Sequence, residues 1–335
     1  MVLKFLLNKK NKINFCGIKL TISNPIPKKI IRKCLYKYIW RKSENYSDIY
    51  VLLTTSGEIY LLSLFLRQIK NSQNIFFVTT RKYHIEILKM ILGDVNYLYL
   101  PEAFELYFED TYKTNYKGKI YNKYLTKSFI SILYDNWFDQ KDKHYISLIK
   151  RYIDFKDGFS KEKPELCFSQ DVEISLKNKI NEIGLNVNKF VYFIPEAKTC
   201  KPIDIQFWKD LYEKFSELGY DVYVNSVGQN KEFSFGKYAN LSITEANLLA
   251  RTSKGVVALR SGMCEPFTLT DVPMTVLYTD VVIDNNIKID ASTIFQTYTL
   301  KKYPYIIKNN LFEYNINLYS KKELIKHIII NITST

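Results

Sequence analysis

The chain has 335 residues, of which 47% are hydrophobic and 24% charged, so it is long enough for two globular domains of ordinary size. Its five cysteines form no CxxC motif and its three histidines are isolated, which argues against a disulfide framework or a zinc centre and fits a reducing cytoplasm. The net charge of +14 favours a nucleic acid, an anionic membrane surface or a phosphorylated substrate as partner, or reflects only a solvated basic surface.

The first 42 residues hold twelve basic residues and no acidic residue. The segment KKIIRKCLYKYIWRK, which follows Pro27, predicts an amphipathic helix. Its basic face carries Lys29, Lys33, Lys37 and Arg41, and its apolar face carries Ile31, Leu35 and Tyr38. Either the basic face docks on anionic lipid, or the apolar face packs on the first domain and the basic face is simply solvated. No apolar run approaches the roughly 20 residues that span a bilayer, so we expect a cytoplasmic protein.

Short apolar strands then alternate with helices, which predicts a parallel sheet with right-handed crossovers. The strands expected first are 48–54, 74–79 and 95–100, and the helices are 59–70 and 83–92. Residues 101–160 show no obvious strand, so we expect helices there, and residues 156–171 resemble a linker.

The pattern repeats in the second half of the chain. The expected strands are 190–194, 221–224, 256–259 and one within 272–278. The expected helices are 173–185, 207–219 with Gly219 at its end, 244–253 with Thr244 as its cap, and a last helix from about 320. We therefore predict an α/β protein with two Rossmann-like domains facing a cleft, the GT-B type. Its parts are residues 1–160, residues 170–320 and a C-terminal helix at 320–335.

The order of these landmarks resembles the bacterial heptosyltransferases, glycosyltransferase family 9. In the first half the resemblance rests on VLLTT, on Ser56-Gly57-Glu58 and on the helix IYLLSLFLRQI. In the second half it rests on FVYFIPEAK, Phe207-Trp208-Lys209, ANLLARTSKGVVALRSGMCEPF and Asp271-Val272-Pro273. Together these segments cover roughly residues 50–100 and 170–280, and their order carries more weight than any one of them.

The resemblance implies an acceptor-side domain, then a nucleotide-sugar-binding domain, and transfer of a sugar to a glycan or glycolipid in bacterial cell-surface polysaccharide biosynthesis. The sequence departs from the family at two motifs. The family's Gly-Asp is Gly57-Glu58 here, and its Asp-Ser-Gly-Pro is Arg260-Ser261-Gly262-Met263. These departures leave the donor sugar open, and a distant family with the same fold fits equally well.

The turn after the strand 256–259 is the first candidate donor site. Backbone N–H groups of Ser261 and Gly262 at the start of a helix are suited to a phosphate, and Arg260 can add a bidentate contact. Glu265 is a candidate for the ribose hydroxyls. The alternative is an ordinary strand-to-helix turn.

Lys198 and Lys201 follow the strand 190–194, and ligands of open α/β sheets bind beyond the carboxyl ends of the strands. Fixed cations there would stabilise a departing nucleoside diphosphate and take the place of a metal, since no Asp-x-Asp motif stands where one is expected. We therefore expect no metal and no cofactor, with the nucleotide-sugar as substrate. The alternative is that both lysines are merely solvated.

Glu58 is the candidate general base that takes the proton of the acceptor hydroxyl, although an acid at a helix N-terminus is favourable in its own right. Thr55 and Ser56 are candidates for acceptor contacts or for the helix cap, and Arg81 and His84 are further acceptor candidates. The aromatic side chains of Trp137, Trp208 and the stretch 107–124 suit either sugar stacking or a core.

Two other functions stay open. A basic nucleic-acid-binding protein would need a recognition motif, and none is visible, so we expect no nucleic-acid partner. A sugar-nucleotide epimerase would need acid–base residues on both faces of the sugar, and would act on the donor alone.

Overall fold

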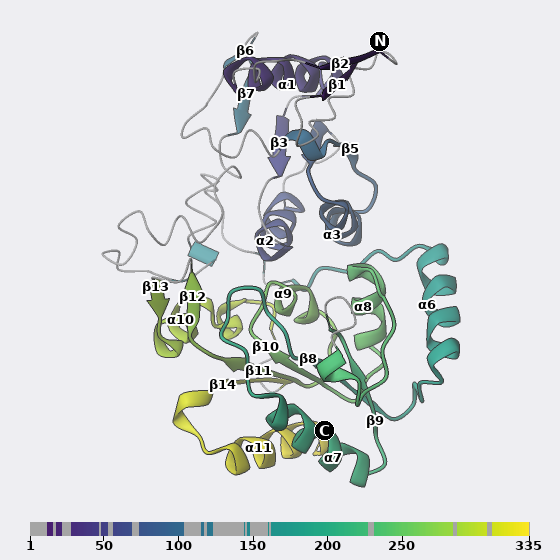
Figure 1. The fold of residues 1–335 in the computed structure, drawn as a ribbon, viewed down its shortest axis with the longest axis vertical. Coiled ribbons are helices and arrows are strands. Elements are labelled where there is room, and N and C mark those ends of the chain that lie inside the picture. The colour runs from purple at the N-terminus through teal and green to yellow at the C-terminus, as the bar shows by residue number, and fades with distance from the viewer. Residues whose placement is uncertain are drawn as a thin grey trace. The chain divides into compact units, whose positions relative to one another are not determined.

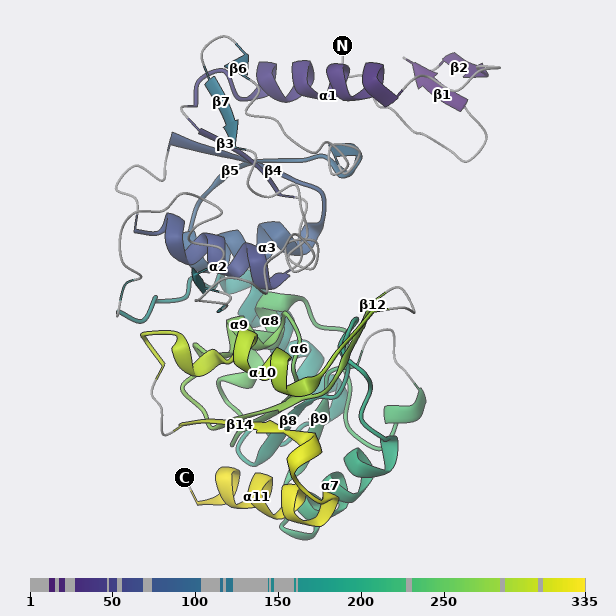
Figure 2. The same ribbon diagram turned by 90° about the vertical axis from the view of Figure 1, so that its left-hand side faces the viewer.

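The computed structural model is shown in Figures 1 and 2. It describes residues 12–15, 18–21, 28–46, 48–52, 56–68, 74–103, 115–116, 119–122, 144, 146–147, 160, 162–226, 231–283, 287–306 and 310–334. Contacts divide the chain into two compact units: residues 1–54, 73–85 and 95–131 form the first, and residues 55–72, 86–94 and 132–335 form the second. The predicted domain boundary near residue 160 stays a prediction.

The first unit is built on a five-stranded sheet in the order β5-β4-β3-β7-β6. Strands β3, β4, β5 and β7 run parallel, and β6 is antiparallel to β7. Its strands are β3 (Asp48–Leu52), β4 (Ile75–Thr79), β5 (Asn96–Tyr99), β6 (Asn115–Tyr116) and β7 (Lys119–Asn122). The expectation of no strand between residues 101 and 160 is therefore wrong. An antiparallel hairpin of β1 (Lys12–Phe15) and β2 (Ile18–Thr21) precedes the sheet.

Helix α1 (Lys28–Lys42) confirms the predicted N-terminal helix. Its side chains Leu35, Ile39 and Trp40 are buried in one cluster with Ile49, Val51, Phe76 and Val78 of β3 and β4. Alternate residues of a strand point to opposite faces, so α1 covers one face of this sheet. Of the predicted apolar face, Leu35 packs on the first sheet as expected, Tyr38 is half-buried outside this cluster, and the side chain of Ile31 falls outside the described residues.

The second unit contains a fully parallel sheet in the order β14-β11-β10-β8-β9. Its strands are β8 (Phe190–Ile194), β9 (Asp221–Val224), β10 (Val256–Leu259), β11 (Met274–Tyr278) and β14 (Leu311–Asn315). A two-stranded hairpin, β12 (Val281–Ile283) and β13 (Ile287–Ile289), follows β11. The buried strands β8, β9 and β10 lie at the predicted residues, because each is a short apolar run.

Helices cover both faces of this second sheet. Its helices are α6 (Gln170–Ile183), α7 (Ile205–Glu217), α8 (Ile243–Ala250), α9 (Cys264–Phe267), α10 (Ala291–Tyr298) and α11 (Lys321–Thr333), and its short 3-10 turns are η5 (Lys231–Phe233), η6 (Leu300–Lys302) and η8 (Ile316–Leu318). Figure 1 shows α7 and α11 on one face and α8 and α9 on the other. The first face buries Trp208 and Phe215 of α7 with Leu324 and Ile328 of α11.

Two further helices lie at the point where the chain passes between the units. Helix α2 (Ser56–Leu66) belongs to the second unit, where it packs on α9 and Tyr60 bonds Tyr305 at 3.0 Å between hydroxyl oxygens. Helix α3 (Lys82–Leu92) begins in the first unit, and its residues from Glu86 onward group with the second.

One predicted cap is wrong. Ser242, not Thr244, caps α8: its hydroxyl accepts from the N–H of Glu245, whose carboxylate accepts from the N–H of Ser242. This reciprocal capping box satisfies two donors at the start of the helix. In the described part of the chain no helix is both long enough and apolar enough to cross a membrane.

Candidate functional site

The strand order of the second sheet reverses between β8 and β10, and this reversal indicates where a ligand would bind. The chain passes from β8 to β9 on one side and later returns to β10 on the other side of β8. At such a reversal the loops after the two neighbouring strands diverge, and ligands of open α/β sheets bind in the crevice between them. Here those loops are residues 195–204 after β8 and the turn Arg260–Met263 after β10, which contain the predicted donor-binding residues except Glu265, which lies in α9.

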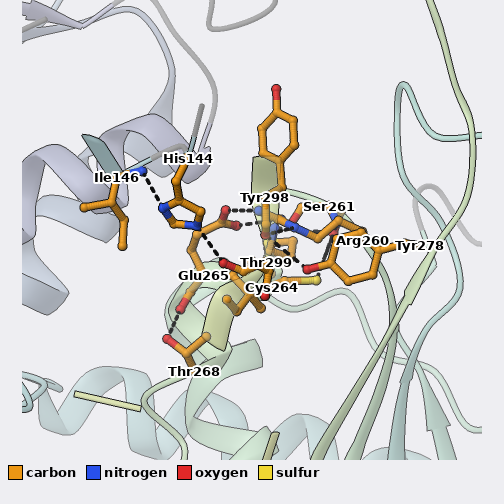
Figure 3. A network of polar contacts seen from close by, with 12 residues as sticks. His144, Ile146, Arg260, Ser261, Cys264, Glu265, Thr268, Tyr278, Tyr298 and Thr299 are labelled. Atoms are coloured by element: carbon orange, nitrogen blue, oxygen red, sulfur yellow. Dashed lines mark hydrogen bonds and ion pairs between the residues drawn. The ribbon is translucent and has the colours of Figure 1, made fainter. Parts of the chain in front are cut away.

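Arg260 of this turn forms an ion pair with Glu265 of α9. The guanidinium nitrogens lie 2.5 and 3.1 Å from the Glu265 carboxylate oxygens, and the side chains are 6% and 1% exposed (Figure 3). Arg260 also donates to the carbonyls of Ser261 at 2.5 Å and Tyr298 at 3.4 Å. Burial opposes the Arg260 charge, but the Glu265 carboxylate more than offsets it and raises the pKa of Arg260. Arg260 therefore connects the turn, α9 and the end of α10, and its predicted phosphate contact stays a prediction.

Two backbone N–H groups of this turn are directed at side chains of the same short segment. The N–H of Ser261 points to Cys264 Sγ at 3.4 Å, and the N–H of Met263 donates to Ser261 Oγ at 3.4 Å. Helix α9 has only four residues, and the side chain of Met263 makes no cap bond. A short helix has a small dipole, so a phosphate at this turn would depend more on nearby cations than on α9.

Gly262 is where α2 approaches the turn most closely. A Cβ atom built on Gly262 would lie 2.6 Å from Ser56 Oγ and 3.1 Å from the Gly57 nitrogen. The first residues of α2 therefore contact the donor-side turn, and only a glycine leaves room for them. Glu58, the predicted base, stands in the first turn of α2 and is 4% exposed.

Lys198 and Lys201 are exposed in the loop after β8. Between them, the half-buried Cys200 donates its thiol proton to the carbonyl of Arg260, with Sγ 2.9 Å from the oxygen. Burial raises the pKa of this thiol. Cys200 thus ties the loop that carries both lysines to the end of β10, and their donor-binding roles stay predictions.

Sequence reasoning missed two residues at this site. Tyr298 ends α10: its carbonyl accepts from Arg260 and from the Tyr278 hydroxyl, and its ring centre lies 5.6 Å from the Arg260 guanidinium carbon. Burial and then the nearby Glu58 carboxylate raise the pKa of the Tyr298 phenol well above its usual value, which places it close to the predicted base. In Figure 3 its ring points away from the buried network.

His144 is the second missed residue. One ring nitrogen accepts from the N–H of Ile146 at 3.3 Å, so the other carries the proton and donates to the Thr299 carbonyl at 2.8 Å (Figure 3). His144 is buried and anchors its segment to the residue after Tyr298. No local motif could reveal this contact, because 155 positions separate the two partners.

Of the predicted acceptor residues, Ser56 begins α2 beside Gly262. Thr55 falls outside the described residues. In the first unit, Arg81 is partly exposed and bonds the Tyr83 hydroxyl at 2.5 Å, while His84 is fully buried against Tyr83. Their acceptor roles stay predictions. Trp208 is buried in the core, and Trp137 and most of the 107–124 stretch fall outside the described residues.

Within the described ranges, no group of three or more His, Cys, Asp or Glu side chains is arranged to hold a metal ion.

No family model matches the sequence, and no curated protein matches it. Solved structures do match. A glycosyl transferase family 9 protein from Veillonella parvula is 12% identical with a TM-score of 0.57, and the match covers 87% of this chain and 98% of that one. The ADP-heptose LPS heptosyltransferase II of E. coli is also 12% identical with a TM-score of 0.54, and the match covers 86% and 99%. This likeness confirms, as a fold, the resemblance to glycosyltransferase family 9 and the α/β class with two Rossmann-like domains of the GT-B type.

Proposed function

We propose that the chain is a glycosyltransferase that moves a sugar from a nucleotide-sugar to a hydroxyl of a glycan or glycolipid in bacterial cell-surface polysaccharide biosynthesis. The observation that carries this proposal is the placement of Glu58 and the donor loops together. Gly262 admits the start of α2 to the turn after β10, and Cys200 fastens the loop of Lys198 and Lys201 to the same turn. In this proposal Glu58 is the carboxylate and Lys198 and Lys201 are the two cations of a ligand site beyond the carboxyl ends of the parallel strands.

The proposed reaction uses this arrangement directly. The acceptor hydroxyl oxygen attacks the anomeric carbon, and the bond from that carbon to the diphosphate oxygen breaks, with its electron pair passing to the diphosphate. Glu58 takes the hydroxyl proton. Lys198 and Lys201 stabilise the negative charge that grows on the departing diphosphate. No cofactor takes part in this scheme.

The donor is proposed only as a class of compound, because its sugar and its base stay open. The E. coli structure of this fold is described as an ADP-heptose enzyme, which makes ADP-heptose one donor to test. Arg260, which replaces the acidic residue of the family motif, is neutralised by Glu265. A different sugar or base is therefore an equal candidate, and we propose only a nucleoside diphosphate sugar.

The first test is a thermal-shift screen against UDP, GDP, ADP, CMP and their sugars, because ligand binding stabilises the folded state. At 100 times the dissociation constant, the stabilisation should be about 2.7 kcal/mol. A stabilising nucleotide-sugar is then incubated with and without acceptor glycans. Transfer to an acceptor supports the proposal. Conversion of the donor alone would identify an epimerase, and no shift with any nucleotide would overturn the proposal.

For location, we propose a protein at the inner face of the cell membrane, where a glycolipid acceptor lies. The support is the basic side of α1, on which Lys37 and Arg41 are exposed.

A further inference from the structure

Asp280 holds several segments together at the carboxyl end of β11. Its carbonyl accepts from the N–H of Lys201 at 2.7 Å. Its carboxylate accepts from the N–H of Ala291, the first residue of α10, at 3.0 Å and pairs with the Lys288 ammonium at 3.1 Å. Although burial opposes the charge of Asp280, its bonds to Lys288 and Ala291 lower its pKa, so it is ionised at neutral pH. Asp280 therefore joins the donor loop, α10 and the β12–β13 hairpin.

The donor loop, residues 195–204, is bonded to the first strand of this hairpin. Cys200 forms an antiparallel bridge with Val281 of β12, and the N–H of Val282 donates to the Thr199 carbonyl at 3.0 Å. Val282 in turn faces Lys288 across the hairpin. Because β10 lies between β8 and β11, this loop crosses the carboxyl end of β10 to reach the hairpin. Figure 1 shows the hairpin beside α10.

Three lysines stand on the two segments that this crossing joins. Lys198, Lys201 and Lys288 are all exposed, and Lys288 pairs with the Asp280 carboxylate. Arg260 adds no net charge, because Glu265 neutralises it. A diphosphate carries the opposite charge and would match the three ammonium groups better than two of them alone.

Lys288 can exchange its contact with the Asp280 carboxylate for one with a diphosphate. Lys288 is 67% exposed and Asp280 is 12% exposed, and an ion pair with one exposed partner is weak. If Lys288 left, the Asp280 carboxylate would keep the bond from the Ala291 N–H. The ammonium can therefore turn to a diphosphate at little cost to the fold.

We propose that Lys288 of the β12–β13 hairpin is a third cation of the donor site and binds the diphosphate group of the nucleotide-sugar. This proposal rests on the proposed function. The hairpin then has a binding role, and the chain carries the charge of its donor site on three lysines from two segments.

The test compares Lys288→Gln with Lys288→Arg, with Lys198→Gln as a positive control and Lys326→Gln as a matched negative control. Lys326 is an exposed lysine of α11, on a different element from the hairpin and the donor loop. Calorimetry measures the affinity of each variant for UDP, GDP, ADP and CDP and for the matching nucleosides. Lys288→Gln should weaken diphosphate binding about tenfold, the low end for a charged hydrogen bond, and leave nucleoside binding unchanged.

Charge and salt provide the second readout. Lys288→Arg should bind like the wild type, and Lys288→Gln should flatten the dependence of diphosphate affinity on salt concentration. If Lys198→Gln weakens binding while Lys288→Gln does not, this inference is overturned and the proposed function stands. If the wild type binds no nucleoside diphosphate, the proposed function itself fails.

Discussion

Gly262 offers the most direct test of how the site is assembled. In Gly262→Ala the new Cβ would lie 2.6 Å from Ser56 Oγ and 3.1 Å from the Gly57 nitrogen, closer than packed atoms normally approach. Overpacking of this kind costs about 1–3 kcal/mol. For a unit of this size, that corresponds to a fall in Tm of about 2–12 °C.

The same clash should impair transfer, because α2 can relieve it only by moving away from the turn and taking Glu58 with it. A misplacement of about 1 Å can cost about 10²-fold in rate. We therefore expect turnover to fall more than nucleoside diphosphate affinity, as measured by an activity assay and calorimetry on the same preparation.

A double-mutant cycle isolates the contact. Ser56→Ala removes the nearest atom, so Ser56→Ala/Gly262→Ala should recover part of the lost Tm, and the coupling should exceed about 0.5 kcal/mol. An unchanged Tm in Gly262→Ala, or strictly additive effects in the cycle, would show that α2 does not approach the turn as described.

Three further changes test other parts of the site. Glu58→Gln should lower turnover by about 10²–10⁴-fold and leave donor affinity unchanged, and near-normal turnover would place the base elsewhere. Arg260→Met leaves Glu265 buried without its partner, so the free energy of unfolding measured with denaturant should fall by about 3–5 kcal/mol. The double variant Arg260→Met/Glu265→Leu should restore most of this loss. A single variant as stable as the wild type would contradict the buried pair. Asp271 has a φ of 66°, a conformation that glycine adopts without strain, so Asp271→Gly should keep the wild-type Tm although it loses the Lys163 ion pair. Asp271→Val should cost about 1–2 kcal/mol, and equal Tm values for both variants would exclude backbone strain there.

The elements that local pattern predicts well are the buried ones. Strands β8, β9 and β10 are short apolar runs between polar turns, and their bounds match the expected residues. Strand β7 was missed because KIYN is four residues long with polar residues at both ends, and it is defined by pairing with β3. The α8 cap follows from the sequence pattern of Ser242 and Glu245 three residues later, which is a capping box, whereas Thr244 lies inside the first turn of the helix.

In the candidate site, too, the features set by local sequence could be predicted, and the contacts set by tertiary structure could not. The loops after β8 and β10 were predictable, because ligand-binding loops follow parallel strands and their sequences contain lysines, serine and glycine. The Arg260–Glu265 pair was not, since a spacing of five residues makes neighbours in neither a helix nor a strand, and only the turn brings the two side chains together. His144 and Asp280 join segments that are remote in sequence, so their roles depend on tertiary structure.

The basic helix α1 provides the last prediction. The apolar side chains of α1 are buried against the first sheet, so they are not available to insert into lipid; they are Leu35, Ile39 and Trp40. Docking would then rest on charge alone, at about 1 kcal/mol for each lysine or arginine near an anionic surface.

Changing Lys29, Lys33, Lys37 and Arg41 to Gln should abolish sedimentation with anionic liposomes at low salt and preserve activity on a soluble acceptor analogue. The wild type should be released by added salt, because purely electrostatic attraction is screened. Binding that persists at high salt would mean that apolar contacts are involved after all, and a wild type that ignores anionic liposomes at low salt would leave α1 with a structural role only.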